Sequence, residues 1–185
     1  MATSHGEIEQ AAFRLFAERG FEGTTLEDIA REVGVGRRTL FRYFDSKNDI
    51  PWGQFDRTLQ GFREIFRDLP EDLPTHQAVQ IAVRRFNEFP DEAHLQHRER
   101  MSLILQTPAL QAHSVLRYGQ WRAVIAEYVA HRTGQRPDDL LPVTIGHVSL
   151  ALAISAYESW LHDNSVGLPA LIDAAFSGLR EHLHP

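Results

Sequence analysis

The strongest chemical signal in the sequence is a cluster of arginines in the segment VGVGRRTLFRYF. On a helix of about 100° per residue, Arg38 and Arg42 share one face. Leu40 and Phe44 share the opposite, apolar face, and Arg37 falls in the first turn. A guanidinium group held in this way can donate two hydrogen bonds to the O6 and N7 atoms of guanine, or pair with a phosphate group. The pattern therefore favours a short helix that is anchored by one face and presents cations on the other.

A simpler interpretation is that Arg38 and Arg42 are only a solvated pair on a helix surface. That arrangement slightly destabilises a helix, because like charges four residues apart repel. The net charge of the chain is −6, which is unusual for a nucleic-acid-binding protein. Between Arg31 and Lys47, however, five cationic side chains stand against two carboxylates. A local positive patch of this kind can dock on DNA even when the whole chain is acidic.

Two helices are predicted to position the cationic segment. The first should begin at Ser4, because Ser4 and Glu7 have the spacing of a capping box, and should end at a glycine. The second should begin at Thr24, which has the same spacing to Glu27. A glycine-containing turn then leads into a third short helix over about residues 36–44. This arrangement is typical of a helix-turn-helix.

The rest of the chain is also predicted to be helical, because no alternating strand pattern persists. A fourth helix should begin at Ser46 and run to about Asp68, with a kink or an irregular first turn at Pro51. Later helices are expected over residues 75–88, 91–106, 109–133, 138–162 and 168–183. The expected fold class is all-α, with about nine helices.

Composition restricts the other classes of function. The chain has no cysteine, so it can form neither a disulfide framework nor a thiolate metal site. His94 and His97 have the spacing of metal ligands and Glu92 is near, but a third ligand with convincing spacing is missing, so no metal or other cofactor is expected. The sequence lacks the G-x-S-x-G and H-E-x-x-H motifs, and no enzyme is expected. Neither a membrane-spanning apolar run nor a secretory signal is expected, which favours a soluble, cytoplasmic protein without a membrane partner.

The stretch IEQAAFRLFAERGFEGTTLEDIAREVGVGRRTLFRYFDSKNDI resembles the DNA-binding domain of TetR-family transcriptional regulators. The resemblance covers about residues 8–50 without a gap, and it rests on the elements LFAERGF, TT, DIA, GVG, TLFRYF and SK. Further segments are similar to regulators associated with mycofactocin gene clusters. These segments are GRRTLFRYFDSKNDIPWGQFD, TPALQAHSVLRYGQWRAVIAEYVAHRTG and AYESWL.

The resemblance implies roles for the residues that match the family pattern. The two threonines of TTLEDIA would contact phosphate at a helix start, and the three arginines would approach bases or phosphates. Thr39, Tyr43 and Lys47 would fix the register on the DNA backbone. Phe41 stands where the family usually has tyrosine and would contact a thymine methyl group. The predicted DNA-binding residues are Thr24, Thr25, Arg37, Arg38, Thr39, Phe41, Arg42, Tyr43 and Lys47.

The resemblance also implies two domains with different tasks. Residues 1–48 would form the helix-turn-helix DNA-binding domain, and residues 49–185 would sense a ligand and form a homodimer. The last two helices contain small residues that allow close approach, so they could pair with their copies in a four-helix bundle. These small residues are Gly146, Ser149, Ala153, Ala156, Ala174, Ala175 and Gly178. The alternative is that the same faces pack within one subunit.

A ligand pocket is expected between the helices of the larger domain. The candidates for its lining are large apolar residues, although most residues of this kind must form the core, and the spacing of Phe62 and Phe66 is typical of a core. These candidates are Phe62, Phe66, Met101, Leu105, Tyr118, Trp121 and Tyr157. Their composition suggests a hydrophobic or amphipathic effector. Arg98, Arg100 and Arg117 could meet an anionic end of the effector or be surface charges.

The expected function is therefore that of a ligand-responsive, homodimeric repressor. It would bind a palindromic operator in double-stranded DNA and be released by a small-molecule effector. The alternative is a protein-interaction adaptor whose helix-turn-helix no longer binds DNA, and the cationic segment argues against that alternative.

Overall fold

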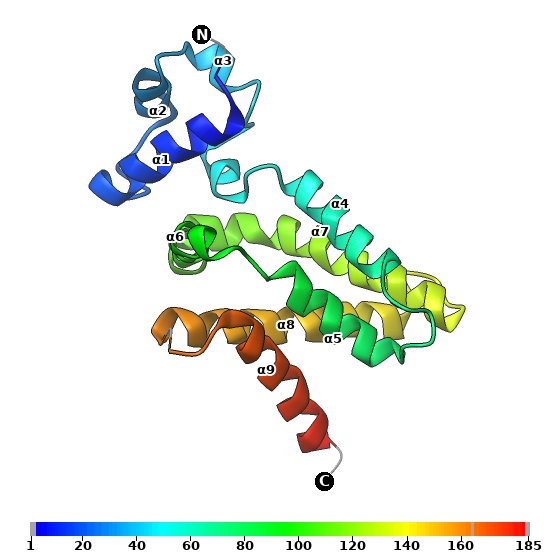
Figure 1. The fold of residues 1–185 in the computed structure, drawn as a ribbon. Helices are drawn as coiled ribbons and strands as arrows, with labels where there is room; N and C mark the ends of the chain where they lie inside the picture. The colour runs from blue at the N-terminus through cyan, green and yellow to red at the C-terminus, as the bar shows by residue number, and fades with distance from the viewer. Residues whose placement is uncertain (1–2, 164, 184–185) are drawn as a thin grey trace. The chain divides into compact units, whose positions relative to one another are not determined.

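A computed structural model describes residues 3–163 and 165–183, and the regular elements within these ranges are helices (Figure 1). The predicted all-α fold class is thereby confirmed. The described ranges contain nine α-helices and two 3-10 helices: α1 (His5–Arg19), α2 (Leu26–Val33), α3 (Arg37–Leu40), η1 (Lys47–Trp52), α4 (Phe55–Arg67), α5 (Thr75–Phe86), η2 (Asp91–Ala93), α6 (His94–Gln106), α7 (Pro108–Thr133), α8 (Leu140–His162) and α9 (Leu168–Leu183).

The chain folds into two compact units. Unit 1 comprises Met1–Phe55 and Glu99–Ser114, and unit 2 comprises Asp56–Arg98 and Val115–Pro185. Unit 1 therefore holds α1, α2, α3 and η1 together with the end of α6 and the beginning of α7. The unit that contains the helix-turn-helix thus extends past residue 48 and includes a second segment, Glu99–Ser114, from the middle of the chain.

Capping boxes begin both α1 and α2, and the predicted box of α1 is confirmed. In α2 the N-cap is Thr25, whose hydroxyl accepts a hydrogen bond from the Asp28 backbone N–H, so the prediction of Thr24 as the cap is wrong. Thr24 is buried instead, and its hydroxyl donates to the carbonyl oxygens of Leu15 and Gly20. The two threonines have the same capping chemistry, and this inward hydrogen bonding decides which one begins the helix.

The segment after α2 is less regular than predicted. The helical part of the cationic segment is only one turn long, and residues 41–43 form a turn rather than the predicted continuation to Phe44. The predicted irregularity near Pro51 is confirmed, but as a separate 3-10 helix rather than a kink. Proline lacks the N–H that an α-helix needs there. Gly53, with a φ of 57°, then ends η1 before α4 begins at Phe55.

The core of unit 1 anchors α3. Ile8 of α1, Ile29 of α2 and Leu40 of α3 are fully buried in one apolar cluster. Ile50 of η1 and Leu110 of α7 are fully buried in the same cluster. Burying a side chain of this size contributes about 1.5–3 kcal/mol. The apolar face of α3 is therefore held firmly while its other face is left to solvent.

In unit 2, α8 packs against α9 and α5 (Figure 1). By length and composition α8 is also the one helix among the described residues that could cross a membrane, with a hydropathy of 1.6 over its most apolar window. The expectation that no run is this apolar is therefore wrong. Only 33% of that window is buried within the chain, so α8 presents an extensive apolar surface that its own chain leaves uncovered.

Candidate nucleic-acid interface and ligand pocket

The three arginines of the cationic segment are exposed to solvent. Arg37 pairs with Glu27 of α2, with 2.7 Å between Nη1 and Oε1, and its guanidinium group lies 5.3 Å from the ring centre of Phe41. Arg38 and Arg42 are exposed as well, Arg38 on α3 and Arg42 in the turn that follows it. Because the side chain of Arg37 is 64% exposed, its ion pair is worth at most about 1 kcal/mol. Arg37 can therefore exchange Glu27 for a phosphate or a base at little cost.

Two residues predicted to touch the DNA backbone are bound within unit 1. The hydroxyl of Tyr43 donates to the backbone oxygen of Thr3 at 2.5 Å. The Nζ atom of Lys47 donates to the backbone oxygens of Phe21 and Thr24, at 2.7 and 2.9 Å. These bonds tie the turn after α3 to the start of the chain, and η1 to the loop between α1 and α2. Both side chains thus position the cationic segment.

The start of α2 is a poorer phosphate site than predicted. Thr24 is fully buried and its hydroxyl donates to backbone oxygens within the chain, which does not favour its predicted contact with phosphate. Thr25 is exposed, but the first turn of α2 carries Glu27 and Asp28. Hydrogen bonds from the side chain and then the backbone of Thr25 lower the pKa of Asp28, so this carboxylate stays charged. Two negative charges oppose the attraction of the helix N-terminus for phosphate. Thr39, on α3, is half-buried.

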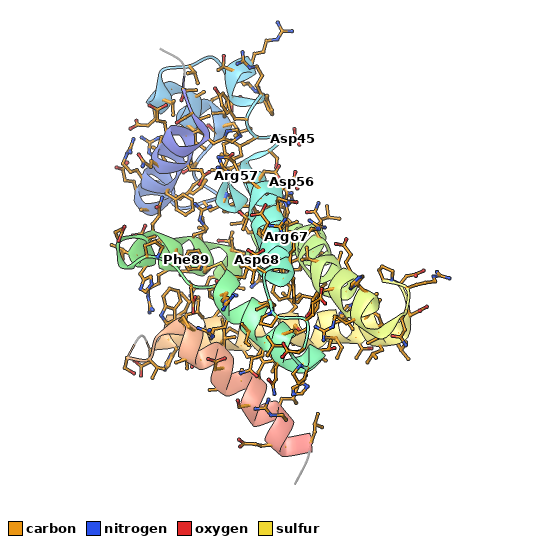
Figure 2. The ribbon with its side chains drawn as sticks, turned by 45° about the vertical axis from the view of Figure 1, so that its right-hand side comes forward. Asp45, Asp56, Arg57, Arg67, Asp68 and Phe89 are labelled. Atoms are coloured by element: carbon orange, nitrogen blue, oxygen red, sulfur yellow. The ribbon has the colours of Figure 1, made fainter. Side chains whose placement is uncertain are left out.

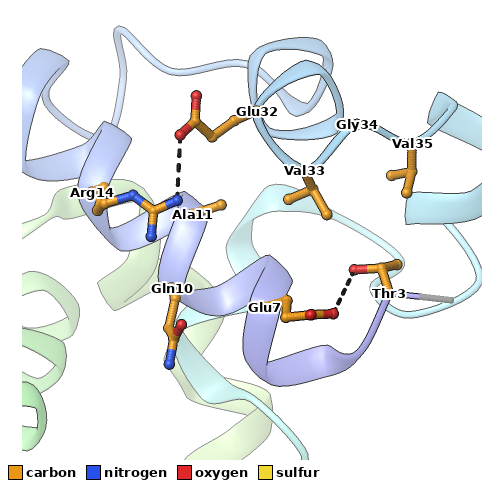
Figure 3. A pocket seen from close by; sticks show the side chains of 9 residues that line it. All are labelled: Thr3, Glu7, Gln10, Ala11, Arg14, Glu32, Val33, Gly34 and Val35. Carbon is orange, nitrogen blue, oxygen red and sulfur yellow. Dashed lines mark hydrogen bonds and ion pairs between the residues drawn. The ribbon is translucent and has the colours of Figure 1, made fainter. Parts of the chain in front are cut away.

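A groove of about 370 Å³ lies between α1 and the end of α2 (Figure 3). Its acidic groups already have partners: Glu32 pairs with Arg14 at 3.3 Å, and Glu7 accepts hydrogen bonds from Thr3 and Ser4. The hydrogen bond from the Ser4 backbone is the main reason that the pKa of Glu7 is lowered. This groove is polar and internally satisfied, and it contributes to capping rather than to a ligand site.

The predicted ligand-binding aromatics form a packed cluster in unit 2. The ring centres of Phe62 and Trp121 are 5.3 Å apart in a stacked arrangement, and that of Phe66 is 5.1 Å from Phe62. The ring centre of Phe86 lies 4.4 Å from that of Phe62. All of Phe62 and almost all of Phe66 and Trp121 are buried. Their rings fill the interior of unit 2, and their contacts are those of a core.

The other four predicted ligand residues are divided between the units. Met101 and Leu105 are half-buried in unit 1. Tyr118 and Tyr157 belong to unit 2, and Tyr157 is buried. Burial raises the pKa of the Tyr157 phenol, and the neighbouring phenol of Tyr118 raises it further. Tyr157 is thus a neutral hydroxyl group within unit 2.

Unit 2 also contains a pocket of about 360 Å³ that the sequence did not reveal. Its walls are formed by the connection after α5, the first turns of α6, the end of α8 and the start of α9. Phe89, which lies in the connection after α5, is labelled in Figure 2. Its lining residues are Asn87, Phe89, His94, Leu95, His97, Arg98, Trp160, Gly167, Leu168 and Pro169. The sequence had offered His94 and His97 as possible metal ligands and Arg98 as a contact for the anionic end of an effector. Within the described ranges, no three side chains of the His, Cys, Asp or Glu type converge to hold a metal ion.

The small residues predicted to face a second copy are divided between two faces. Gly146, Ser149, Ala153 and Ala156 of α8 are buried within the chain, so the alternative of packing inside one subunit holds for them. A Cβ atom at Gly146 would lie 3.0 Å from the backbone oxygen of Arg122, which shows how closely α8 approaches α7. Other residues of α8 are exposed, and α9 also has exposed small residues. The exposed residues are Thr144, Val148, Ala151, Ser155, Ala170, Ala174 and Gly178, whereas Ala175 is half-buried.

Comparison with known proteins agrees with these features. The profile for bacterial regulatory proteins of the tetR family matches residues 8–50, and the profile for the MftR C-terminal domain matches residues 73–184. The chain is 43% identical over 175 residues to MftR of Mycobacterium tuberculosis (strain H37Rv), a protein named as a mycofactocin biosynthesis transcriptional regulator. That alignment covers 95% of this chain and 88% of its relative.

Two solved structures show the same fold. A TetR-family regulator from Syntrophomonas wolfei has a TM-score of 0.67 at 15% identity, covering 94% of this chain and 91% of its own. FadR of Thermus thermophilus, a TetR-family repressor in complex with lauroyl-CoA, has a TM-score of 0.60 at 20% identity, covering 94% of this chain and 92% of its own. Because both family profiles match and the alignment with MftR covers 95% of this chain, the chain belongs to the TetR family of transcriptional regulators and is similar to MftR.

Proposed function

We propose that this regulator is a homodimeric repressor that binds a palindromic operator and leaves it when an amphipathic small molecule binds. The observation that carries the proposal is the exposure of Arg37, Arg38 and Arg42 on a segment whose apolar residues are buried. Such a segment can enter a major groove, and each bidentate contact from arginine to guanine contributes about 1–3 kcal/mol of discrimination.

We assign roles to the predicted DNA-binding residues from their exposure and from the hydrogen bonds that they make within the chain. The three arginines contact bases or phosphates, and Phe41, which is 39% exposed, contacts a thymine methyl group. Thr25, which is exposed, and Thr39, which is half-buried, contact the DNA backbone. Tyr43 and Lys47 hold the segment in place through their internal hydrogen bonds. Thr24 has no direct role.

The proposed dimer uses the exposed residues of α8 and α9. Val148 and Ala151 on α8 and Ala174 and Gly178 on α9 are exposed, and their small size permits close packing of helices from two copies. Such a contact would also cover the apolar surface of α8. Two copies place two α3 segments on one duplex, and half-sites on one face of DNA lie about 34–36 Å apart.

The class of effector is proposed from the relatives. FadR is solved with lauroyl-CoA, and SmeT, another similar structure with a TM-score of 0.64, is solved with triclosan. Lauroyl-CoA is amphipathic, because an apolar acyl chain is joined to a charged coenzyme A group, and triclosan is a largely apolar molecule. An effector of this class that favours the form unable to bind DNA by about 1–3 kcal/mol would lower operator affinity by about 5- to 150-fold. In this role the protein would work in the cytoplasm, in contact with chromosomal DNA.

The test is a titration of the full chain onto labelled duplexes from the region upstream of its own gene, followed by fluorescence anisotropy. We expect one duplex to bind at least tenfold more tightly than a scrambled duplex of the same composition, and lauroyl-CoA to weaken that binding. Equal binding of all duplexes would contradict a specific operator, and no binding to any duplex would instead support the adaptor alternative. Specific binding that no amphipathic molecule reduces would remove the effector from the proposal.

A further inference from the structure

We propose that Glu27 is a specificity-determining residue of the DNA interface, which directs Arg37 toward a guanine base and away from the phosphates. This role rests on the proposed function, because it concerns how the interface selects its operator. Glu27 is not among the predicted DNA-binding residues, and its spacing in the sequence had suggested only a capping box with Thr24.

The side chain of Glu27 is not the one that caps α2. The capping box forms one residue later, where the Thr25 hydroxyl accepts a hydrogen bond from the Asp28 backbone and the Asp28 carboxylate accepts one from the Thr25 backbone. Asp28 also pairs with Arg31, with 3.1 Å between Oδ1 and Nη1. The two carboxylates of this turn therefore have different tasks, and the task of Glu27 lies outside its own helix.

Glu27 reaches the first residue of α3. Its Oε1 atom lies 2.7 Å from the Nη1 atom of Arg37. The same guanidinium group lies 5.3 Å from the ring centre of Phe41, so a carboxylate from α2 and an aromatic ring from the turn after α3 together place it. A guanidinium group carries five N–H donors, and contact with one carboxylate leaves donors for the O6 and N7 atoms of guanine.

The ion pair sets Arg37 apart from the other arginines of the cationic segment. Within residues 3–163 and 165–183, no carboxylate pairs with Arg38 or Arg42, and both side chains are exposed. Their full charge is available to phosphates, which supply affinity but no sequence information. Arg37 is the one of the three arginines whose charge is partly compensated, and a base needs less charge than a phosphate does.

A carboxylate beside the guanidinium group affects phosphate and guanine differently. A phosphate that docks on Arg37 brings a full negative charge close to Glu27, well inside the screening length of about 8–10 Å at ordinary salt. The O6 and N7 atoms of guanine are neutral acceptors, so the carboxylate repels them less. The capping box fixes the backbone at the start of α2, so Glu27 stays near Arg37 even when the ion pair breaks. Glu27 therefore disfavours phosphate more than it disfavours a base.

The test compares the wild-type protein with Glu27→Gln, which keeps the size of the side chain and removes its charge. The probes are the upstream duplex that the wild type binds most tightly and a scrambled duplex of the same composition. Fluorescence anisotropy gives both affinities, and their ratio is the readout. We expect Glu27→Gln to bind the scrambled duplex more tightly, so that the ratio falls by about fivefold, the size of an exposed charge interaction.

The matched control is Glu32→Gln. Glu32 lies near the other end of α2, its side chain is 44% exposed, and it pairs with Arg14 of α1 at 3.3 Å. The control removes the same charge from the same helix and leaves the partner of Arg37 in place. We expect both affinities to change together in this variant, with an unchanged ratio. An equal fall of the ratio in both variants would reduce the effect to net charge and overturn the role of Glu27.

Single base-pair changes, made in both half-sites, locate the contact. We expect one G·C pair whose replacement weakens binding by the wild type but not by Arg37→Ala, and this is the pair that Arg37 reads. Glu27→Gln should reduce the penalty at that pair alone, because Arg37 can then turn to a phosphate. Added to Arg37→Ala, Glu27→Gln should leave the ratio unchanged, and a further fall there would overturn the proposal.

The outcome for the wild type separates this role from the proposed function. A wild-type protein that binds every duplex equally would contradict the proposed function and, with it, the role of Glu27. A wild type that prefers its operator, together with an unchanged ratio in Glu27→Gln, would overturn the role of Glu27 and leave the proposed function standing.

Discussion

Arg100 of α6 and Glu9 of α1 form an ion pair inside unit 1, with 2.7 Å between Nη2 and Oε2. The side chains are only 20% and 13% exposed, respectively. Arg100 also donates to the backbone oxygen of Pro51 at 2.5 Å, and its guanidinium group lies 5.1 Å from the ring centre of Phe13. One arginine from the middle of the chain thus joins α1 to η1, the segment that follows the cationic turn. The sequence had offered Arg100 only as a ligand contact or a surface charge.

Replacing Arg100 should destabilise the protein. In Arg100→Met the carboxylate of Glu9 loses its cation in a mostly buried position, so we expect the free energy of unfolding to fall by about 1–3 kcal/mol. The control is Arg63→Met in unit 2, where the pair with Glu127 is 3.0 Å long but 42% and 47% exposed, and the loss should stay below about 1 kcal/mol. Urea unfolding of both variants checks this, and equal losses would contradict it.

Gly53 should not tolerate alanine. Its φ is 57°, and a Cβ atom there would lie 2.9 Å from the Oε1 atom of Glu9. Gly53→Ala should therefore destabilise the protein by about 1–3 kcal/mol through backbone strain and displacement of that carboxylate. Gly61→Ala, inside α4 with open space around it, should instead stabilise by about 0.5–1 kcal/mol. Thermal unfolding distinguishes the two, and a stabilising Gly53→Ala would show that the site is unstrained.

The capping box of α2 should make stability depend on acid pH. The folded-state pKa of Asp28 is lowered below its ordinary value of 3.8, first by the Thr25 side chain and then by the Thr25 backbone. The contribution of Asp28 to the stability of the fold is therefore fully present when the pH is above that ordinary value. It is lost as the pH falls through the lowered pKa. We expect the melting temperature to drop on acidification from about pH 5 to pH 3.

Thr25→Ala removes the largest cause of that shift, so its melting temperature should depend less on pH over the same range. Thr24→Ala, next in the chain, removes the hydrogen bonds to Leu15 and Gly20 and should lower the melting temperature without changing its pH dependence. If the two variants respond to pH alike, the assignment of the cap to Thr25 is incorrect.

The proposed dimer should depend on the exposed residues of α8. Ala151→Arg places a long cation where two copies are proposed to meet, so we expect light scattering to detect monomers and operator affinity to fall at least tenfold. Ala112→Arg is the matched control, because Ala112 is also exposed on a helix, α7, but belongs to unit 1. A dimer that survives Ala151→Arg would place the interface elsewhere.

Local signals in the sequence were sufficient to predict where helices form, but they were insufficient to predict which residues of different helices contact one another. Ser4 and Glu7 identified the start of α1 because a capping box is complete within four residues. Thr24 and Thr25 could not be told apart, because only the fold shows which hydroxyl turns inward. The small residues around Gly146 predicted close packing, but whether the partner was α7 or a second copy is a tertiary question.

The sequence offered Arg98 as a contact for an anionic ligand, but it did not show which other residues surround Arg98 in the pocket of unit 2. Tyr157 lies 60 residues from His97 and 70 from Asn87 in the sequence, and each of the three alone is an ordinary polar residue of a helical protein. The spacing of Phe62 and Phe66 was typical of a core, although both residues were also candidates for the lining of a pocket. The structure gives them the contacts of a core.

The most direct test of the account is the salt dependence of operator binding by the wild-type protein and by Arg38→Ala. Arg85→Ala, at an exposed arginine of α5 in unit 2, is the control. Removing a phosphate or base contact in both halves of a dimer should weaken operator binding by about 1–3 kcal/mol per contact, and should flatten the plot of log affinity against log salt by up to about 2. We predict this loss for Arg38→Ala alone. Identical affinities and slopes for all three proteins would contradict the assignment of the α3 arginines to DNA.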